Sequence, residues 1–233
     1  AANWEAALRL LASALPSGPA IVVLDELPWI LEGDRGLEGT LQKLWDTVFE
    51  RVPVLLILVG SDLAMMEMLT SHARPLFGRA RELVVNPFHV ADTAKMLGLA
   101  DAGAAFDAQI VTGGYPRLLA ELRRARSLTH FLSVQLQDEN ADLVVVGTRI
   151  LGAEFPVEAQ ARRVLSAIGC GERTFSGLQR IAGLKASALT RSIEILKNAK
   201  RILAVDLPLS TKPSRDSRYR VDDPYLRFWL RFL

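Results

Sequence analysis

The sequence predicts an α/β fold that passes into a small all-helical region and then into a compact α+β module. Two continuous apolar runs, residues 20–24 and 54–59, alternate with amphipathic stretches, which is typical of parallel strands joined by helices. Beyond Pro87 only helical periodicity remains. Two short helical segments then flank a turn at Gly183 and precede two short strands, which indicates a helix-turn-helix followed by a β-hairpin wing.

The first part of the chain is expected to build the sheet. Its strands are predicted to be buried on both faces, because their apolar residues are continuous rather than alternating. Pro53 ends the helix before the second strand, and Asn86-Pro87 end the third. The expected elements are helices over residues 3–15, 40–51 and 64–71, strands over 20–25, 54–59 and 82–85, and a loop over 33–39.

The rest of the chain is expected to be mainly helical. Gly113-Gly114 separate two of its helices, and their apolar stripes are interpreted as core packing. The aromatic segment 224–233 is so apolar that we expect it to dock onto other residues. The expected helices cover 90–97, 104–111, 116–125, 128–143, 159–168, 175–182 and 186–198, and the wing loop 208–216 joins expected strands at 202–207 and 217–221.

Composition narrows the class of protein. Half of the 233 residues are hydrophobic and 23% are charged, as in globular chains, and the longest apolar runs are far too short to span a bilayer. One cysteine excludes an internal disulfide and favours a cytoplasmic location. Residues 1–156 carry 13 Lys/Arg and 19 Asp/Glu (net −6), whereas 157–223 carry 13 and 7 (net +6), so an anionic partner is favoured for the second part.

Two adjacent carboxylates, Asp25 and Glu26, come directly after the first strand. Open α/β sheets bind ligands at the carboxyl ends of their strands, so this pair is a candidate site. The same pair can also be two solvated acids at the end of a strand. Four hydrophobic residues followed by Asp-Glu form the Walker B pattern of P-loop ATPases, in which the first acid organises Mg²⁺ and the second polarises water.

The order of these features resembles the prokaryotic AAA+/STAND-type ATPases often called archaeal DEXX-box ATPases, relatives of the origin-recognition initiators. The tail, Tyr-Arg-Val-Asp-Asp-Pro-Tyr-Leu-Arg-Phe-Trp at 219–229, is the most specific match, and the resemblance covers essentially the whole chain. The other matching segments are 20–30 (Walker B), 58–61 (the end of the sensor-1 strand), 75–81 (Leu-Phe-Gly-Arg before the last strand) and 112–119 (the start of the sensor-2 helix).

The resemblance implies a role for each candidate residue. Asp25 would hold Mg²⁺, largely through water, and Glu26 would polarise the attacking water. Ser61 would contact that water or the γ-phosphate of ATP, with Asp62 a weaker candidate. Arg79 or Arg81 would stand where related proteins carry an arginine finger, and Arg117 would contact the γ-phosphate. Each arginine has an alternative reading as a surface or strand-edge charge, although a helix amino terminus such as that before Arg117 also attracts anions.

One feature of the family is absent from the sequence. No Gly-x-x-x-x-Gly-Lys-(Ser/Thr) occurs, and that loop supplies the N–H cradle and the lysine for the phosphates. We therefore expect the chain to lack the first strands of the ATPase core and to be inactive alone. In this class the P-loop strand lies between the sensor-1 strand and the last strand, so residues 54–59 and 82–85 are not expected to pair.

The resemblance divides the chain into four parts and suggests its function. Residues 1–88 would be a partial P-loop NTPase core, 89–156 a helical lid, 157–223 a winged helix-turn-helix domain and 224–233 the start of a further segment. The expected function is an ATP- and Mg²⁺-dependent, AAA+-type hydrolytic switch coupled to a winged helix. The alternative is a DNA- or protein-binding module with a vestigial nucleotide site.

The winged-helix region is expected to contact duplex DNA through its phosphates. Its third helix offers few Asn, Gln or Arg side chains for base edges, so little sequence preference is expected. Packing against the ATPase core, against a protein partner or in self-association is the rival reading. The candidate contacts are Arg191, Lys197, Lys200 and Arg201 at the third helix, and Lys212, Arg215 and Arg218 in the wing.

Overall fold

A computed structural model describes residues 3–154, 159–208 and 216–233. The chain forms two compact units, Ala1–Val84 and Val85–Leu233, which we describe separately. Within the described residues, no helix is both long and apolar enough to cross a membrane.

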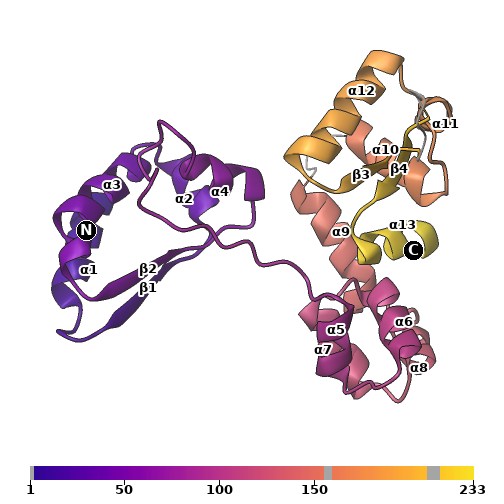
Figure 1. The fold of residues 1–233 in the computed structure, drawn as a ribbon, viewed down its shortest axis with the longest axis horizontal. Helices are drawn as coiled ribbons and strands as arrows, with labels where there is room; N and C mark the ends of the chain where they lie inside the picture. Colours follow the sequence, from indigo (N-terminus) through magenta and orange to yellow (C-terminus); the bar gives the residue numbers. More distant parts are fainter. Residues whose placement is uncertain (1–2, 155–158, 209–215) are drawn as a thin grey trace. The chain divides into compact units, whose positions relative to one another are not determined.

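The first unit is a two-stranded parallel sheet with helices on one face (Figure 1). β1 (Ala20–Leu24) pairs with β2 (Val54–Leu58) so that Leu24 lies opposite Leu58. The shared core includes Leu8, Leu44 and Phe49, all at most 2% exposed. The helices of this unit are α1 (Trp4–Ala14), α2 (Leu27–Gly33), α3 (Leu37–Thr47), the 3-10 turn Phe49–Arg51 and α4 (Leu63–Leu69).

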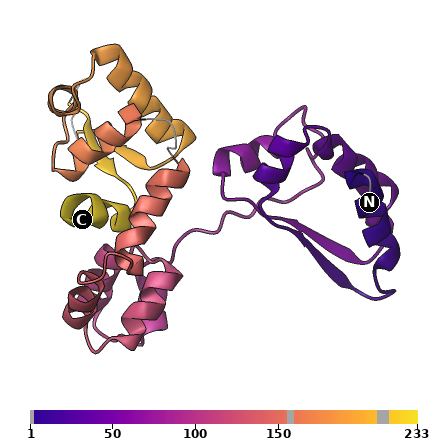
Figure 2. The same cartoon turned by 180° about the vertical axis from the view of Figure 1, so that it is seen from behind.

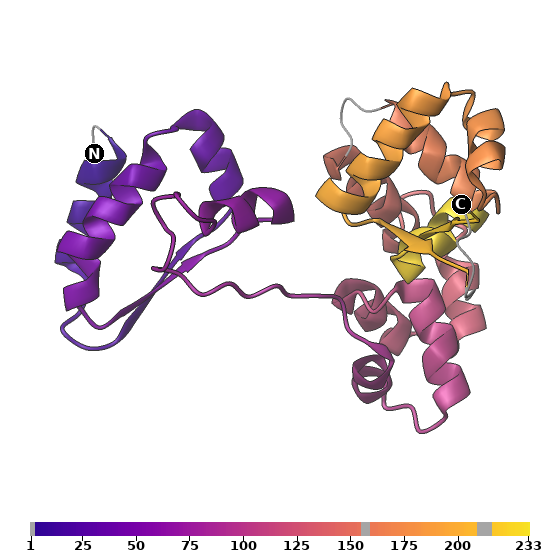
Figure 3. The same cartoon turned by 45° about the horizontal axis from the view of Figure 1, so that its top comes forward.

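The opposite face of this sheet is bare, as Figure 3 shows. Ile21 and Val23 on β1 are 69% and 53% exposed, and Leu55 on β2 is 57% exposed. The prediction that the strands are buried on both faces is therefore wrong for the described chain, because its helices cover one face only. The α2 helix was also missed, because its 7 residues are too few to show a clear helical periodicity.

The expected third strand at 82–85 does not form. These residues belong to no strand or helix, and Leu83 is 85% exposed. A β-prone segment becomes a strand only when a neighbouring strand accepts its backbone hydrogen bonds. Among the described residues β2 pairs with β1 alone, so 54–59 and 82–85 do not pair, as predicted.

The second unit begins with helices that pack around Leu118, Phe131 and Leu143. The expected helix over 128–143 is two helices, because the polar stretch 137–141 interrupts it. The elements here are α5 (Val90–Leu97), α6 (Ala102–Thr112), α7 (Pro116–Arg124), α8 (Leu128–Gln135) and α9 (Asp142–Glu154).

The following elements form a second cluster around Leu165, Leu178 and Leu189. Three helices are followed by a two-stranded antiparallel sheet, seen from behind in Figure 2. In this sheet Leu203 lies opposite Val221. The elements are α10 (Ala159–Gly169), α11 (Phe175–Ala182), α12 (Ala186–Glu194), the π-helical turn Ile195–Ala199, β3 (Leu203–Asp206) and β4 (Arg218–Val221). The wing residues Lys212 and Arg215 lie outside the described residues.

The last helix, α13 (Pro224–Phe232), joins the two clusters of this unit. Tyr225 is fully buried in the first cluster, and the next residue, Leu226, is buried in the second. Gly147 on α9 and Gly169 at the end of α10 both lie against α13: a Cβ at Gly147 would stand 2.5 Å from the Trp229 ring, and one at Gly169 would stand 2.6 Å from Leu230. The expected docking of the aromatic tail is therefore confirmed.

Candidate functional site

The carboxylates after β1 stand on a strained turn. Glu26 has φ 52° and ψ 42°, the left-handed conformation that non-glycine residues avoid, at the residue before α2. Its N–H donates to Asp25 Oδ1 at 2.9 Å, and the N–H of Leu27 donates to the Val59 carbonyl at 2.9 Å, which ties the turn to the end of β2. Such strain is often kept where it places a functional side chain.

The end of β2 lies directly against this turn. A Cβ at Gly60 would stand 2.6 Å from Pro28 Cδ, so only glycine allows the approach. Ser61 follows and is exposed, and no described residue bonds its hydroxyl. The Asp62 carboxylate accepts from the N–H of Met65 at 2.9 Å and thus caps α4, which gives this residue a structural role.

The sheet therefore presents Asp25, Glu26 and Ser61 at one edge, where two parallel strands end. Carboxylate and hydroxyl oxygens are ligands that Mg²⁺ accepts together with several waters. Among the residues described, no group of three or more His, Cys, Asp or Glu lies close enough to hold a metal by itself. The donor set fits Mg²⁺ held partly by water and phosphate, and it does not fit a closed protein cage.

Arg79 forms an ion pair with Asp46 that the sequence did not predict. Its Nε and Nη2 donate to the two carboxylate oxygens of Asp46 at 2.7 and 2.9 Å, and Nη1 donates to the Pro75 and Phe77 carbonyls. This contact closes the loop before the extended segment onto α3. A phosphate role for Arg79 stays a prediction that requires it to leave Asp46, whereas Arg81 is exposed.

The Asp46–Arg79 pair gives a testable pH dependence. Hydrogen bonding from Arg79 lowers the pKa of Asp46 below its usual value. A lowered pKa stabilises the fold above the unfolded value, about 3.9, and this contribution is lost as the pH falls through the lowered value. We expect the stability difference between the natural chain and Asp46→Asn, measured by urea unfolding, to shrink between pH 6 and pH 3.

The control is Glu32→Gln, which removes an exposed carboxylate that has no ion pair among the described residues. Its stability difference should stay nearly constant over the same pH range. An Asp46→Asn difference that does not change with pH would show that the pair contributes nothing to acid sensitivity.

Arg117, the candidate γ-phosphate contact, is exposed at the second position of α7. Its Nε and Nη2 donate to Asp142 Oδ2 and Oδ1 at 2.6 and 2.7 Å, and this hydrogen bonding raises the pKa of Arg117. Asp142 lies in the first turn of α9, which the sequence did not separate from the preceding helix. No signal in the sequence singled it out.

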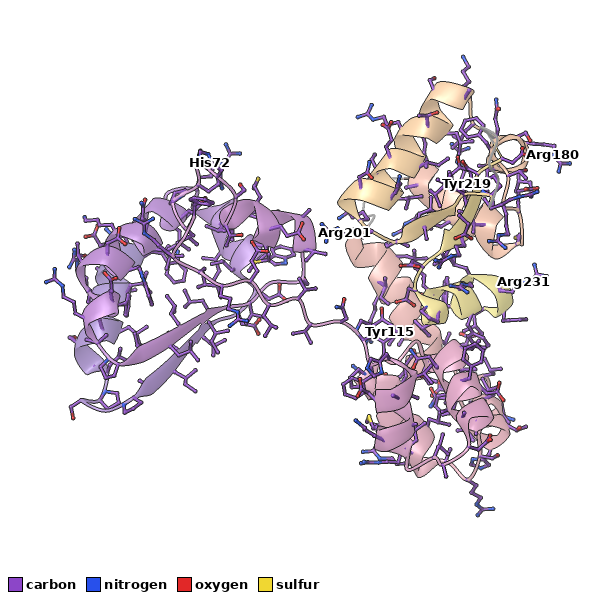
Figure 4. The ribbon with its side chains drawn as sticks, in the orientation of Figure 1. His72, Tyr115, Arg180, Arg201, Tyr219 and Arg231 are labelled. Atoms are coloured by element: carbon purple, nitrogen blue, oxygen red, sulfur yellow. The ribbon has the colours of Figure 1, made fainter. Side chains whose placement is uncertain are left out.

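The segment that precedes Arg117 is packed on both sides. The N–H of Phe88 donates to the Gly114 carbonyl at 2.9 Å, and the Tyr115 hydroxyl donates to the Asp223 carboxylate at 2.6 Å. Figure 4 marks Tyr115 near the start of α13. A Cβ at Gly113 would stand 2.6 Å from Tyr225 Cβ. Two of the segments that carried the resemblance, 112–119 and 219–229, therefore meet in one contact.

Burial shapes the chemistry of that contact. It raises the pKa of Asp223, although the hydrogen bond from Tyr115 acts in the opposite direction. The Tyr225 hydroxyl accepts from the N–H of Gly147 at 2.7 Å and donates to the Leu143 carbonyl at 2.9 Å. These groups satisfy one another, so we interpret them as structural.

The candidate DNA contacts do not form a single cluster. Arg191 on α12, Lys197 on the π turn and Arg218 at the start of β4 are exposed, and no ion pair among the described residues uses them. Arg201 instead lines a cavity of about 320 Å³ together with His89, Gln109, Asp222 and Asp223. Lys200 is half-buried beside it in the chain.

Other cations were missed in the sequence. Arg180 on α11 and Lys185 in the turn before α12 are both exposed. Their position next to the third helix was the signal that could have found them.

Comparison with known proteins finds similarity to a solved structure. No family model and no curated protein matches the chain. Among solved structures, a Walker-type ATPase of Pyrococcus abyssi is similar, with a TM-score of 0.64 and 19% sequence identity, over 99% of this chain and 68% of the other. At this identity the likeness concerns the fold, and the chain has a fold like that of a Walker-type ATPase.

Proposed function

We propose that the chain carries the magnesium- and water-activating side of an AAA+-type P-loop ATPase, coupled to a helical lid and a winged helix. The observation that carries this proposal is the edge of the sheet, where Asp25, Glu26 and Ser61 follow two paired parallel strands. The neighbour with a Walker-type ATPase fold supports it. Among the described residues β2 pairs with β1 alone, so its other edge is free to accept the strand of a phosphate-binding loop.

Each residue would act on the phosphates or on water. Asp25 would hold Mg²⁺, largely through water, and the ion would neutralise charge on the phosphates. Glu26 accepts a proton from the attacking water, and Ser61 orients that water or donates to the γ-phosphate. Arg117 donates to phosphate oxygens with its planar guanidinium. An arginine-finger role for Arg79 requires its release from Asp46.

Two proteins test the ATPase proposal. The 233-residue chain alone should show no ATP hydrolysis, because it has no phosphate cradle. A protein that joins this chain to a Gly-Lys-(Ser/Thr) loop with its strand should hydrolyse ATP with Mg²⁺. In that protein Glu26→Gln should keep ATP binding and lower turnover at least about 100-fold, as expected for loss of a catalytic base.

The outcomes separate the ATPase from its alternative. Unchanged turnover in Glu26→Gln would remove Glu26 from the mechanism. No hydrolysis by the joined protein, although it binds ATP, would favour the non-catalytic module with a vestigial nucleotide site. Turnover by the 233-residue chain alone that Glu26→Gln abolishes would overturn our account of the missing cradle.

A second candidate function is weak binding of duplex DNA by residues 157–223. The net charge of +6 in this part and the exposed Arg191, Lys197 and Arg218 support it. With about four phosphate contacts, affinity should fall about 100-fold between 50 and 200 mM salt. Few side chains suited to base edges are present, so a random duplex should bind about as well as any other.

Fluorescence anisotropy with a random duplex and the full chain tests this binding. Replacing Arg191, Arg215 and Arg218 together by alanine should abolish it at low salt. The matched control replaces three exposed arginines outside residues 157–223, Arg123, Arg124 and Arg126, by alanine, which removes the same charge and should leave binding nearly unchanged. No binding by the natural chain, or binding unaffected by the triple substitution, would assign this region to a protein partner or to self-association.

A further inference from the structure

We infer that Asp142 is a positioning residue that fixes the Arg117 guanidinium so that its Nη1 donors are left for a phosphate group. This inference rests on the proposed phosphate role of Arg117. The two carboxylate oxygens of Asp142 accept from Nε and Nη2 in a side-on, bidentate arrangement. Such pairs restrict the plane of the guanidinium as well as its position.

The number of N–H groups on the Arg117 guanidinium decides how many are left to bind a phosphate. A guanidinium has five N–H groups, and the side-on pair uses two of them. Both hydrogens on Nη1 and one on Nη2 are left, and the described residues bond none of these. The Arg117 side chain is 65% exposed, whereas that of Asp142 is 19% exposed. The Asp142 carboxylate is therefore largely shielded from solvent, whereas the free N–H groups of Arg117 are exposed to it.

Asp142 can orient another side chain because its own backbone is held. The N–H of the next residue, Leu143, donates to the Gln135 amide oxygen at 3.1 Å, and the Leu143 carbonyl accepts from the Tyr225 hydroxyl. Trp229 Nε1 donates to the Val144 carbonyl at 2.8 Å. The first turn of α9 is therefore fixed by α8 and α13, and groups on such supported elements position their partners well.

A free arginine would bind phosphate less well. An unrestrained arginine side chain samples many rotamers, and it loses part of that conformational entropy when it binds a phosphate. The Asp142 contact removes that freedom before the phosphate arrives. The negative charge of Asp142 acts in the opposite direction, since it repels an anion, and the experiment has to separate these two effects.

Glu121 on α7 provides the matched control. Its carboxylate is paired with Arg124, three residues along the same helix. Glu121→Gln and Asp142→Asn both remove one negative charge near Arg117, but only Asp142→Asn removes the side-on support. Electrostatics alone would make both variants bind anions slightly better, whereas positioning makes Asp142→Asn bind worse.

The experiment titrates the full chain with sodium tripolyphosphate at low salt and follows the Arg117 Nε–H signal by NMR. We expect binding about tenfold weaker in Arg117→Ala and about fivefold weaker in Asp142→Asn, with Glu121→Gln equal to the natural chain or tighter. The Arg117 Nε–H signal should broaden in Asp142→Asn before any anion is added. If Asp142→Asn fails to fold, Asp142→Glu, which keeps the charge and moves the carboxylate, should weaken binding about twofold.

Different failures point to different steps. Weakened binding in Arg117→Ala with Asp142→Asn equal to Glu121→Gln would overturn the positioning role and leave the phosphate role of Arg117 intact. Binding by Arg117→Ala equal to that of the natural chain, or no binding by the natural chain, would overturn the phosphate role itself and the inference with it. ATP hydrolysis by the joined protein is a separate measurement and does not depend on either result.

Discussion

Tyr225→Ala is expected to lower the free energy of unfolding of the second unit by about 4 kcal/mol. Tyr225 is fully buried, and replacement of a large aromatic side chain in a core by alanine typically costs about 3–5 kcal/mol. The change also leaves the N–H of Gly147 and the carbonyl of Leu143 without their partner. Urea unfolding of the full chain, followed by circular dichroism, measures the loss.

Two further variants divide this effect. Tyr225→Phe keeps the ring and removes the hydroxyl, so it should cost about 1–3 kcal/mol, the range for leaving buried polar groups unpaired. Phe232→Ala on the same helix should cost less than about 0.5 kcal/mol, because Phe232 is 69% exposed. A Tyr225→Ala variant as stable as Phe232→Ala would show that α13 does not hold the second unit together.

Gly114→Ala is expected to have the second large effect. Gly114 has φ 77°, and a Cβ there would stand 1.9 Å from the Phe88 carbonyl oxygen, so the backbone at Phe88 has to move. That movement breaks the bonds from Phe88 N–H to the Gly114 carbonyl and from Gln109 Nε2 to the Phe88 carbonyl. We expect a loss of about 3 kcal/mol from the combined strain and lost hydrogen bonds.

Gly98→Ala is the matched control for the backbone conformation. Gly98 has φ 68°, nearly the same strain for a side chain, but nothing lies within 4 Å of the added Cβ. Gly98→Ala should lower the free energy of unfolding by about 1–2 kcal/mol. Hydrogen exchange should also show faster exchange at Phe88 in Gly114→Ala and not in Gly98→Ala. Equal stability of the two variants would mean that the Phe88 contact is not under steric control.

Local sequence patterns predicted much of the fold and less of the site. Periodicity placed β1 and β2 and nearly all of the helices, because apolar spacing reports the covered face of an element. The same reasoning wrongly predicted a strand at 82–85 and a sheet buried on both faces. The composition of a segment does not tell whether a neighbouring strand or a covering helix is present. The helix break before Asp142 was missed because the polar stretch 137–141 lacks glycine and proline.

The site depended on pairs that are distant in sequence. Asp25 and Glu26 were found because they adjoin a strand, and Ser61 because it follows the next one. Asp46 and Asp142, which bind Arg79 and Arg117, are single acids on helices, 33 and 25 residues from their partners. Nothing local distinguishes such acids from solvated ones, and only the folded chain brings them together.

The division of α13 between two cores has a consequence for synthesis on the ribosome. Gly147 bonds to a side chain that lies 78 residues later in the chain. The helices from α5 to α9 therefore emerge long before Tyr225 can fill their cluster, and contacts this distant in sequence slow folding. Until residue 232 has left the exit tunnel, the nascent helices keep exposed apolar side chains, the kind of surface that chaperones cover.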